Sequence, residues 1–188
     1  MKTNILIIVV SIVAVLTVGC RFFSYESAYE MTPVDEVEVK TLPGSRVLVT
    51  ESEGRYFDRA NGLFKRLFRY IRDHDVAMTV PVEARMEKAQ MLFHLGGKDT
   101  DKALESRDDV QVLEREPLLV ASLGVRGSYS EKNFLEARER LERWLSERDD
   151  LVRAGQPYAV FWNGPFVPGF LKRFEVHLPV KAVVLAMN

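Results

Sequence analysis

The stretch GRYFDRANGLFKRLFRYIRD at residues 54–73 reappears in altered form as GSYSEKNFLEARERLERWLS at residues 127–146. Gly54 and Tyr56 match Gly127 and Tyr129 at a separation of 73 residues. Each stretch continues with apolar residues at the spacing of one face of an α-helix. The repetition indicates an internal duplication in which each copy contributes one amphipathic helix.

The two helices present the same apolar stripe once one residue is inserted in the second copy. At a separation of 74 residues, Leu63, Leu67, Tyr70 and Ile71 fall on Ala137, Leu141, Trp144 and Leu145. We therefore expect helices over about 58–73 and 130–148 that bury equivalent faces in a shared core.

Strand-like stretches surround both helices. Residues 37–40 and 46–51 flank a turn at 42–45 and predict a hairpin, and residues 110–113 and 118–125 predict a second pair of strands. Further strands are expected at 77–82, 91–95, 158–162 and 174–178. The fold class is α+β: a distorted antiparallel β-barrel of two β-β-α-β-β pseudo-repeats, with one helix packed per repeat.

The composition fits one domain with a short appendage. The chain has 188 residues, of which 47% are hydrophobic, and its 26 Lys and Arg against 27 Asp and Glu give a net charge of -1. This balance argues against nucleic acid as a partner. The single cysteine excludes an internal disulfide framework and a cysteine-rich zinc site.

The N-terminus predicts export. Residues 5–19 are apolar apart from Ser11 and Thr17, and the run is short for a spanning helix, so we interpret residues 1–19 as a signal peptide. Leu16-Thr17-Val18-Gly19-Cys20 resembles a bacterial lipoprotein signal, which implies cleavage before a lipid-modified Cys20 and a protein anchored in the cell envelope. An uncleaved anchor is the alternative. Residues 20–32 would form a tether and residues 33–188 the domain.

The two helices differ on one flank. Phe64 and Phe68 stand one turn apart where the second helix has Arg138 and Glu142. The first helix therefore has surplus apolar surface, which either another part of the chain or a ligand must cover. The basic residues beside it are Arg66, Arg69 and Arg72, which would suit a flat apolar ligand bearing carboxylates or would simply form a solvated face.

The segment WNGPFVPGFL at residues 162–171 displays Trp162, Phe166 and Phe170 among two prolines and two glycines. It predicts a rigid, irregular loop that forms either a pocket wall or a plug for the barrel.

Signatures of common enzymes and metal sites are missing. The chain contains no phosphate-binding glycine loop, dinucleotide turn, HExxH or GxSxG motif. The histidines His74, His94 and His177 lack metal-ligand spacing, so we expect a polar helix end at His74 and hydrogen-bonded histidines at the other two. Strand alternation predicts an outward-facing Glu175, whereas an acid/base role would require its burial. We predict neither a metal site nor catalytic residues.

The motifs AMTVPV at residues 77–82 and GPFVPGFLKRFEV at residues 164–176 resemble those of the SOUL haem-binding family, over about residues 29–180. The resemblance implies a barrel of two repeats and a tetrapyrrole pocket between the first helix and the late loop. Carried over by motif, the ligand-binding residues are Phe64 and Phe68, Arg69 as a propionate partner, and Phe166 with its neighbours Trp162 and Phe170.

The sequence departs from the family pattern at two places. It has Lys172-Arg173-Phe174-Glu175-Val176 where Arg-Arg-Asn-Glu-Val is usual, and Val167 where some members have lysine. No histidine precedes His74, so an axial ligand from the first strands is excluded and haem binding would rest on apolar burial and charge pairing.

These observations predict an exported, membrane-tethered, non-enzymatic protein that binds haem, another tetrapyrrole or a similar flat amphipathic ligand. The alternative is a module that uses the same aromatic and basic face to bind a protein partner or the membrane surface. A hydrolase that uses Glu175 is a third hypothesis.

Overall fold

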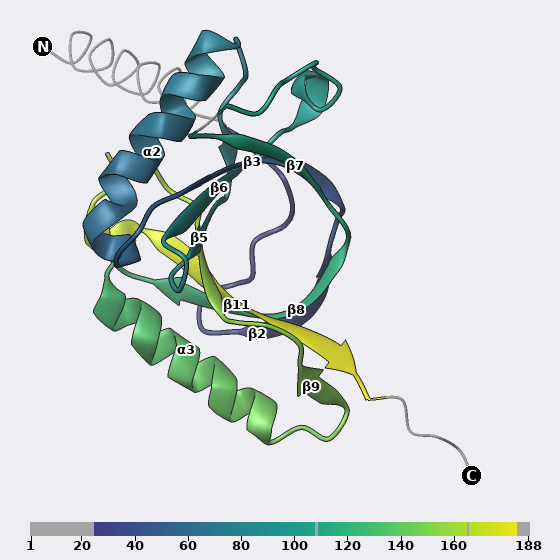
Figure 1. Ribbon diagram of the computed structural model, residues 1–188. Helices are drawn as coiled ribbons and strands as arrows, with labels where there is room; N and C mark the ends of the chain where they lie inside the picture. Colours follow the sequence, from purple (N-terminus) through teal and green to yellow (C-terminus); the bar gives the residue numbers. More distant parts are fainter. Residues whose placement is uncertain (1–24, 108, 165, 184–188) are drawn as a thin grey trace, which may run out of the picture.

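The computed structural model describes residues 25–107, 109–164 and 166–183. A strongly curled, mainly antiparallel sheet forms a half-barrel, and two helices lie outside it (Figure 1). The first unit contains β2 (Val37–Leu42), β3 (Ser45–Glu51), α2 (Tyr56–Asp73), β5 (Val82–Arg85) and β6 (Gln90–His94). The second contains β7 (Gln111–Arg115), β8 (Leu118–Arg126), α3 (Glu131–Ser146), β10 (Tyr158–Phe161) and β11 (Arg173–Ala182). The predicted α+β fold with two β-β-α-β-β units is confirmed.

Short elements complete the fold. They are β1 (Glu26–Ser27), β4 (Thr79–Val80), β9 (Leu151–Arg153) and single 3₁₀ turns at Gly97–Asp99 and Gly169–Leu171. β1 pairs with β4 in parallel, and β9 pairs with the end of β11.

The two units are intertwined through their first strands. β2 pairs with β8, and β7 pairs with β3, so the first strand of each unit pairs with the second strand of the other. The predicted hairpin of 37–40 with 46–51 and the predicted pairing of 110–113 with 118–125 are therefore wrong. A two-residue hairpin requires a positive φ at its first central residue, which is Pro43 in one connection and Glu116 in the other. Proline is fixed at a negative φ, and glutamate rarely adopts a positive one.

The apolar stripes of both helices face the convex side of the sheet (Figure 1). Leu67 and Leu141, which correspond in the two units, are fully buried. Both helices follow a glycine with a positive φ, +96° at Gly54 and +146° at Gly127. This conformation favours glycine, so the shared Gly-x-Tyr motif has the same backbone role in both units.

Residues 25–32, which we assigned to the tether, pack against the half-barrel. The Ala28 N–H donates a hydrogen bond to the Val80 carbonyl at 2.8 Å. A Cβ atom placed on Gly124 would lie 2.1 Å from the Pro33 carbonyl oxygen, so the chain passes directly over this glycine. Residues 1–19 and Cys20 lie outside the described residues. Within the described part of the chain, no helix is long and apolar enough to cross a membrane.

The close approach at Gly124 yields a stability prediction. Gly124→Ala should lower the free energy of unfolding by about 1–3 kcal/mol because the new methyl group overlaps the backbone of residues 32 and 33. Gly62→Ala should raise it by about 0.5–1 kcal/mol because this helical glycine has open space around it. Urea unfolding measures both values. Equal effects of the two substitutions would contradict the packing described for residues 25–33.

Candidate functional site

The flank of α2 carries the aromatic pair that distinguishes it from α3. Phe68 is 47% exposed, and its ring stacks on that of Phe64 with centroids 5.8 Å apart and an interplanar angle of 14°. Phe64 also contacts the edge of Phe93 on β6, at 5.5 Å. Leu67 and Ile71 are buried, which confirms that the two phenylalanines are the less buried pair.

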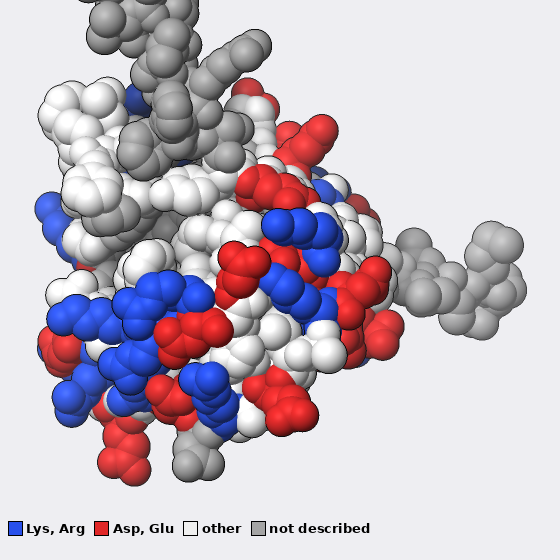
Figure 2. Space-filling model, turned by 90° about the horizontal axis from the view of Figure 1, so that it is seen from above, with Lys and Arg blue, Asp and Glu red and all other residues white. Residues whose placement is uncertain are grey.

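Arg69 lies beside this aromatic pair and is exposed. Arg66 instead donates a hydrogen bond to the Glu51 carbonyl at 2.9 Å, and Arg72 lies 3.3 Å from Asp73. Among the described residues, Arg69 forms no ion pair. In Figure 2, a mixed group of Lys, Arg, Asp and Glu side chains at lower left adjoins a largely uncharged area above it. This side of the molecule therefore combines uncharged and charged surface.

The loop after β10 has an ordered base and an exposed tip. Asn163 donates its N–H to the Tyr129 hydroxyl at 2.7 Å and accepts the Arg173 N–H at 2.6 Å. Phe166 and Phe170 are 92% and 73% exposed, whereas Trp162 is only 9% exposed. Trp162 therefore belongs to the packed interior, and two of the three predicted loop residues are at the surface.

The structure does not bring the loop onto the helix flank. Within the described residues, the rings near Phe64 and Phe68 are each other and Phe93, not those of the loop. Two hollows in the described surface lie along α3 instead, beside Trp144 and Arg140 respectively. The α2 flank is thus an open apolar surface rather than a closed pocket.

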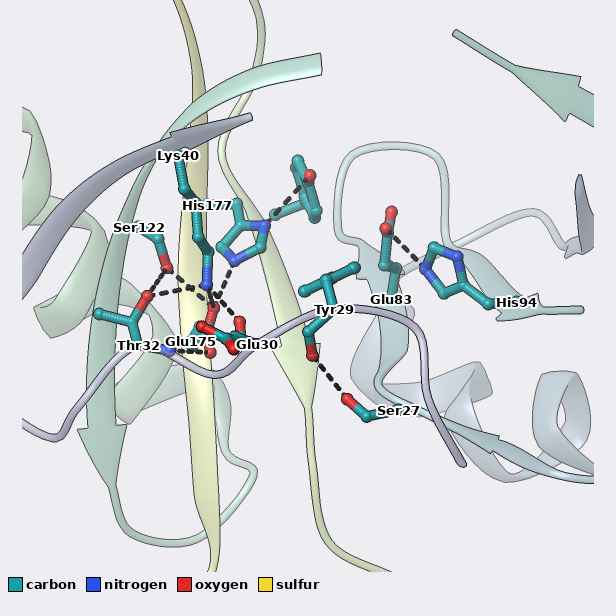
Figure 3. A network of polar contacts seen from close by, with 11 residues as sticks. Ser27, Tyr29, Glu30, Thr32, Lys40, Glu83, His94, Ser122, Glu175 and His177 are labelled. Atoms are coloured by element: carbon teal, nitrogen blue, oxygen red, sulfur yellow. Dashed lines mark hydrogen bonds and ion pairs between the residues drawn. The ribbon is translucent and has the colours of Figure 1, made fainter. Parts of the chain in front are cut away.

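The concave face of the half-barrel holds a polar network around Glu175, which is fully buried (Figure 3). Its carboxylate accepts the Thr32 N–H at 2.7 Å, the Ser122 hydroxyl at 2.8 Å and the Lys40 ammonium at 3.0 Å. The fourth partner is the ring of His177. Residues from the N-terminal segment, β2, β8 and β11 therefore meet at one carboxylate.

The protonation of this cluster follows from its contacts. Burial alone would raise the pKa of Glu175, but the hydrogen bond from His177 and the positive charge of Lys40 lower it below its ordinary value. Burial lowers the pKa of His177. His177 Nδ1 lies 3.2 Å from the Tyr158 hydroxyl. A neutral His177 therefore accepts a hydrogen bond from the Tyr158 hydroxyl at Nδ1. It donates a hydrogen bond from Nε2–H to an ionised Glu175.

A second buried carboxylate lies across the same face. His94 Nε2 is 3.0 Å from Glu83, and Arg115 donates to both Glu83 oxygens at 2.9 Å. Although burial opposes ionisation, the hydrogen bond from His94 and the charge of Arg115 lower the pKa of Glu83 to about 2. Figure 3 shows Tyr29 between this pair and the Glu175 cluster.

These contacts settle three predictions. The outward-facing orientation expected for Glu175 is wrong, because alternation identifies two faces of a strand but not which one is enclosed. The hydrogen-bonded histidines expected at His94 and His177 are confirmed. The polar helix end at His74 is also confirmed, since this residue caps α2 and its ring lies 2.8 Å from the Tyr70 carbonyl.

Sequence reasoning missed the buried network as a whole. The available signal was the occurrence of two polar residues, Glu175 and His177, on one face of an otherwise apolar strand. Their partners Thr32, Lys40 and Ser122 carry no comparable local pattern. Among the described residues, no group of three His, Cys, Asp or Glu is arranged to hold a metal ion.

A half-barrel of two intertwined units with an open aromatic flank on its first helix defines a small α+β domain. The family model described as SOUL heme-binding protein matches residues 24–179. The chain therefore belongs to the SOUL haem-binding protein family. A comparison with curated proteins finds no significant match.

Solved structures share the fold at low sequence identity. The C-terminal domain of EcmrR has a TM-score of 0.62 at 12% identity, covering 79% of this chain and 98% of that domain. EcmrR in a DNA complex scores 0.63 at 13% identity and covers 79% of this chain, which spans 58% of the EcmrR chain. A protein described as a hydrolase from Listeria innocua scores 0.56 at 13% identity, with 80% and 94% covered. These likenesses concern the fold alone.

The buried carboxylates predict acid-sensitive stability. Glu83 has a pKa of about 2 in the folded protein against an ordinary value of 4.5, so the unfolded chain binds its proton first as the pH falls. The ionised Glu83 therefore contributes at most about 3 kcal/mol to the free energy of unfolding. This contribution is fully present above pH ~5 and is lost as the pH falls towards ~2. Unfolding measured across this range should show a shallower decline for Glu83→Gln. An unchanged slope would contradict an ionised, paired Glu83.

Proposed function

We propose that this protein is an exported, membrane-tethered binding protein that holds haem or a similar flat tetrapyrrole against the flank of α2, without catalysing a reaction. The observation that carries the proposal is the exposed Phe68 ring stacked on Phe64 in a member of a haem-binding family. The equivalent flank of α3 has Arg138 and Glu142. A feature that only one of two duplicated helices has is not required by the shared fold.

The side chains at this flank suit a porphyrin in two respects. The exposed face of Phe68 offers a flat apolar surface for the macrocycle. Arg69 offers a guanidinium group that can donate two parallel hydrogen bonds to a propionate carboxylate. The exposed rings of Phe166 and Phe170 would cover the other macrocycle face if the loop closes over the flank.

The histidines of the described residues are all engaged elsewhere. His94 and His177 are buried on the concave face, and the ring of His74 stacks on Tyr70 with centroids 4.1 Å apart. Bound haem would supply an iron centre, but the α2 flank contributes apolar contact and charge pairing rather than an axial histidine. The proposal therefore requires similar affinity for haem and for metal-free porphyrins.

The alternative is that the same face binds a protein partner or the membrane surface. The high exposure of Phe166 and Phe170 favours it, because exposed apolar clusters often mark interaction surfaces. Saturable porphyrin binding in solution supports the first proposal. Binding to anionic vesicles in the absence of any porphyrin affinity supports the second.

The tethering part of the proposal gives a prediction for Cys20. We expect the mature chain to begin at a lipid-modified Cys20, and mass spectrometry of the membrane fraction would detect the shortened, modified N-terminus. Cys20→Ala should abolish both the modification and the processing. Retention of residues 1–19 in the wild-type protein would show that an uncleaved segment provides the anchor instead.

Substitutions at two neighbouring residues on α2 should affect porphyrin binding and fold stability differently. Phe68→Ala should weaken porphyrin binding while leaving the unfolding free energy nearly unchanged, because its ring is half-exposed. Leu67→Ala should destabilise the fold by about 2–5 kcal/mol through lost burial and a cavity. Fluorescence quenching titrations and urea unfolding measure the two quantities. Equal porphyrin affinity of Phe68→Ala and wild type would remove this ring from the site.

Charge pairing at Arg69 can be isolated with the ligand. Arg69→Glu should weaken binding of protoporphyrin more than binding of its dimethyl ester, because only the free acid presents carboxylates. The affinity ratio of the two ligands, measured for wild type and variant, gives the effect directly. Arg59→Glu serves as a control on the same helix. An identical ratio for the wild type and Arg69→Glu would exclude a propionate contact.

A further inference from the structure

The concave face of the half-barrel is built differently from the rest of the interior. The convex face packs a large apolar core against α2 and α3. The concave face has two smaller apolar clusters, around Val47 and Tyr158. Among them it encloses two carboxylates and two histidines, Glu83, Glu175, His94 and His177, all buried. Buried ion pairs stabilise a fold less than apolar residues of the same volume do. A polar interior of this kind is therefore typical of a binding site rather than of a structural core.

The chain's own N-terminal segment fills this face. The Tyr29 ring makes edge contacts with His94 and Trp162 at centroid distances of 5.6 and 5.7 Å, and it lies 5.9 Å from the ring of His177. The side chain thus occupies a slot between the two carboxylate clusters (Figure 3). The Thr32 N–H and the short β1–β4 pairing hold the segment on either side of Tyr29.

Tyr29 fits this slot incompletely. Its hydroxyl, the indole Nε1 of Trp162 and the Nδ1 of His94 are all buried, and none has a hydrogen-bond partner among the described residues. A buried polar group without a partner costs about 1–3 kcal/mol. The slot therefore contains unused hydrogen-bonding capacity at the point where the tyrosine ring lies.

The unused groups specify a complementary ligand. Trp162 Nε1 can only donate. His94 Nε2 is paired with Glu83, which leaves Nδ1 as the ring nitrogen without a partner among the described residues. A hydroxyl group can accept a hydrogen bond and donate another, so a hydroxyl-bearing ring in a slot that both side chains border can pair with either of them. The ring-shaped slot and these two atoms together describe a phenol.

We propose that the concave face is a second binding site, separate from the α2 flank, for a small phenolic compound, and that residues 26–33 act as an internal competitor whose Tyr29 occupies the site. A free phenol can shift until its hydroxyl pairs with Trp162 or His94, whereas the backbone holds the Tyr29 ring in place. Binding then displaces the segment from the half-barrel.

Hydrogen exchange of the full chain with p-cresol as the probe tests the proposal in the wild-type protein. Saturating p-cresol should accelerate amide exchange in residues 26–33 and leave the exchange of α2 and α3 unchanged. Toluene at the same concentration should have no such effect, because it lacks the hydroxyl group. Unchanged exchange of residues 26–33 in saturating p-cresol would overturn the proposal.

Variants of the segment provide a second readout. Tyr29→Ala should bind p-cresol about ten-fold more tightly than wild type. In the wild type, only the fraction of molecules whose slot is free of the Tyr29 ring can bind p-cresol, and the substitution removes this competition. Tyr25→Ala is the matched control: this tyrosine is 41% exposed on the same segment, and its removal should leave the affinity for p-cresol unchanged. Tyr29→Phe keeps the ring and provides a folded variant if Tyr29→Ala does not fold. Because it removes the unpartnered hydroxyl, its ring should occupy the slot more stably, and it should bind p-cresol more weakly than wild type.

Comparing the affinities for p-cresol and toluene tests whether the site recognises the hydroxyl group. Tyr29→Ala should prefer p-cresol, and Trp162→Phe in that background should reduce this preference. Equal binding of the two probes by Tyr29→Ala would show an ordinary apolar cavity and contradict the proposal. The porphyrin affinity of Tyr29→Ala should equal that of wild type, because the porphyrin is proposed to bind at the α2 flank. Loss of p-cresol binding would therefore refute this proposal alone, and loss of porphyrin binding would refute the α2 proposal alone.

Discussion

The buried carboxylate of Glu175 is the interaction on which the arrangement of the half-barrel depends. An ionised carboxylate without partners is very costly inside a protein. Three of its hydrogen-bond partners come from β2, β8 and β11, which are distant in sequence and must therefore assemble together. The Thr32 N–H adds a fourth hydrogen bond from the N-terminal segment. The passage of residues 25–33 over Gly124 and the position of β2 beside β8 agree with this requirement.

This assembly leaves a particular surface for function. The helices cover the convex face of the sheet, and the N-terminal segment fills the concave face, so neither face of the half-barrel is open. The large apolar groups that remain exposed include Phe68 on α2 and the loop residues Phe166 and Phe170. The fold thus separates a stable apolar core from an accessible aromatic surface on one of its two duplicated helices.

Much of this account could be predicted from local patterns. The difference between Leu67 and Phe68 followed from comparing the two copies, because a residue that both helices share is needed for packing. The strand pairing could not be predicted in this way. Most strands were located, although the predicted strand at 77–82 covers only the short β4 and the first residue of β5, and β1 and β9 were not expected. Their pairing could not be found locally, because the partners of β2 and β7 come from the other unit. The Glu175 cluster escaped prediction because its members are far apart in the sequence.

The location of a bound tetrapyrrole is the central claim, and NMR of the isotopically labelled protein with haem tests it most directly. Paramagnetic iron broadens the signals of nearby nuclei, and zinc protoporphyrin provides the diamagnetic reference. The account predicts broadening centred on Phe64, Phe68 and Arg69, with weaker effects at Phe166 and Phe170. Broadening centred instead on the hollows along α3 or on the concave face would contradict it.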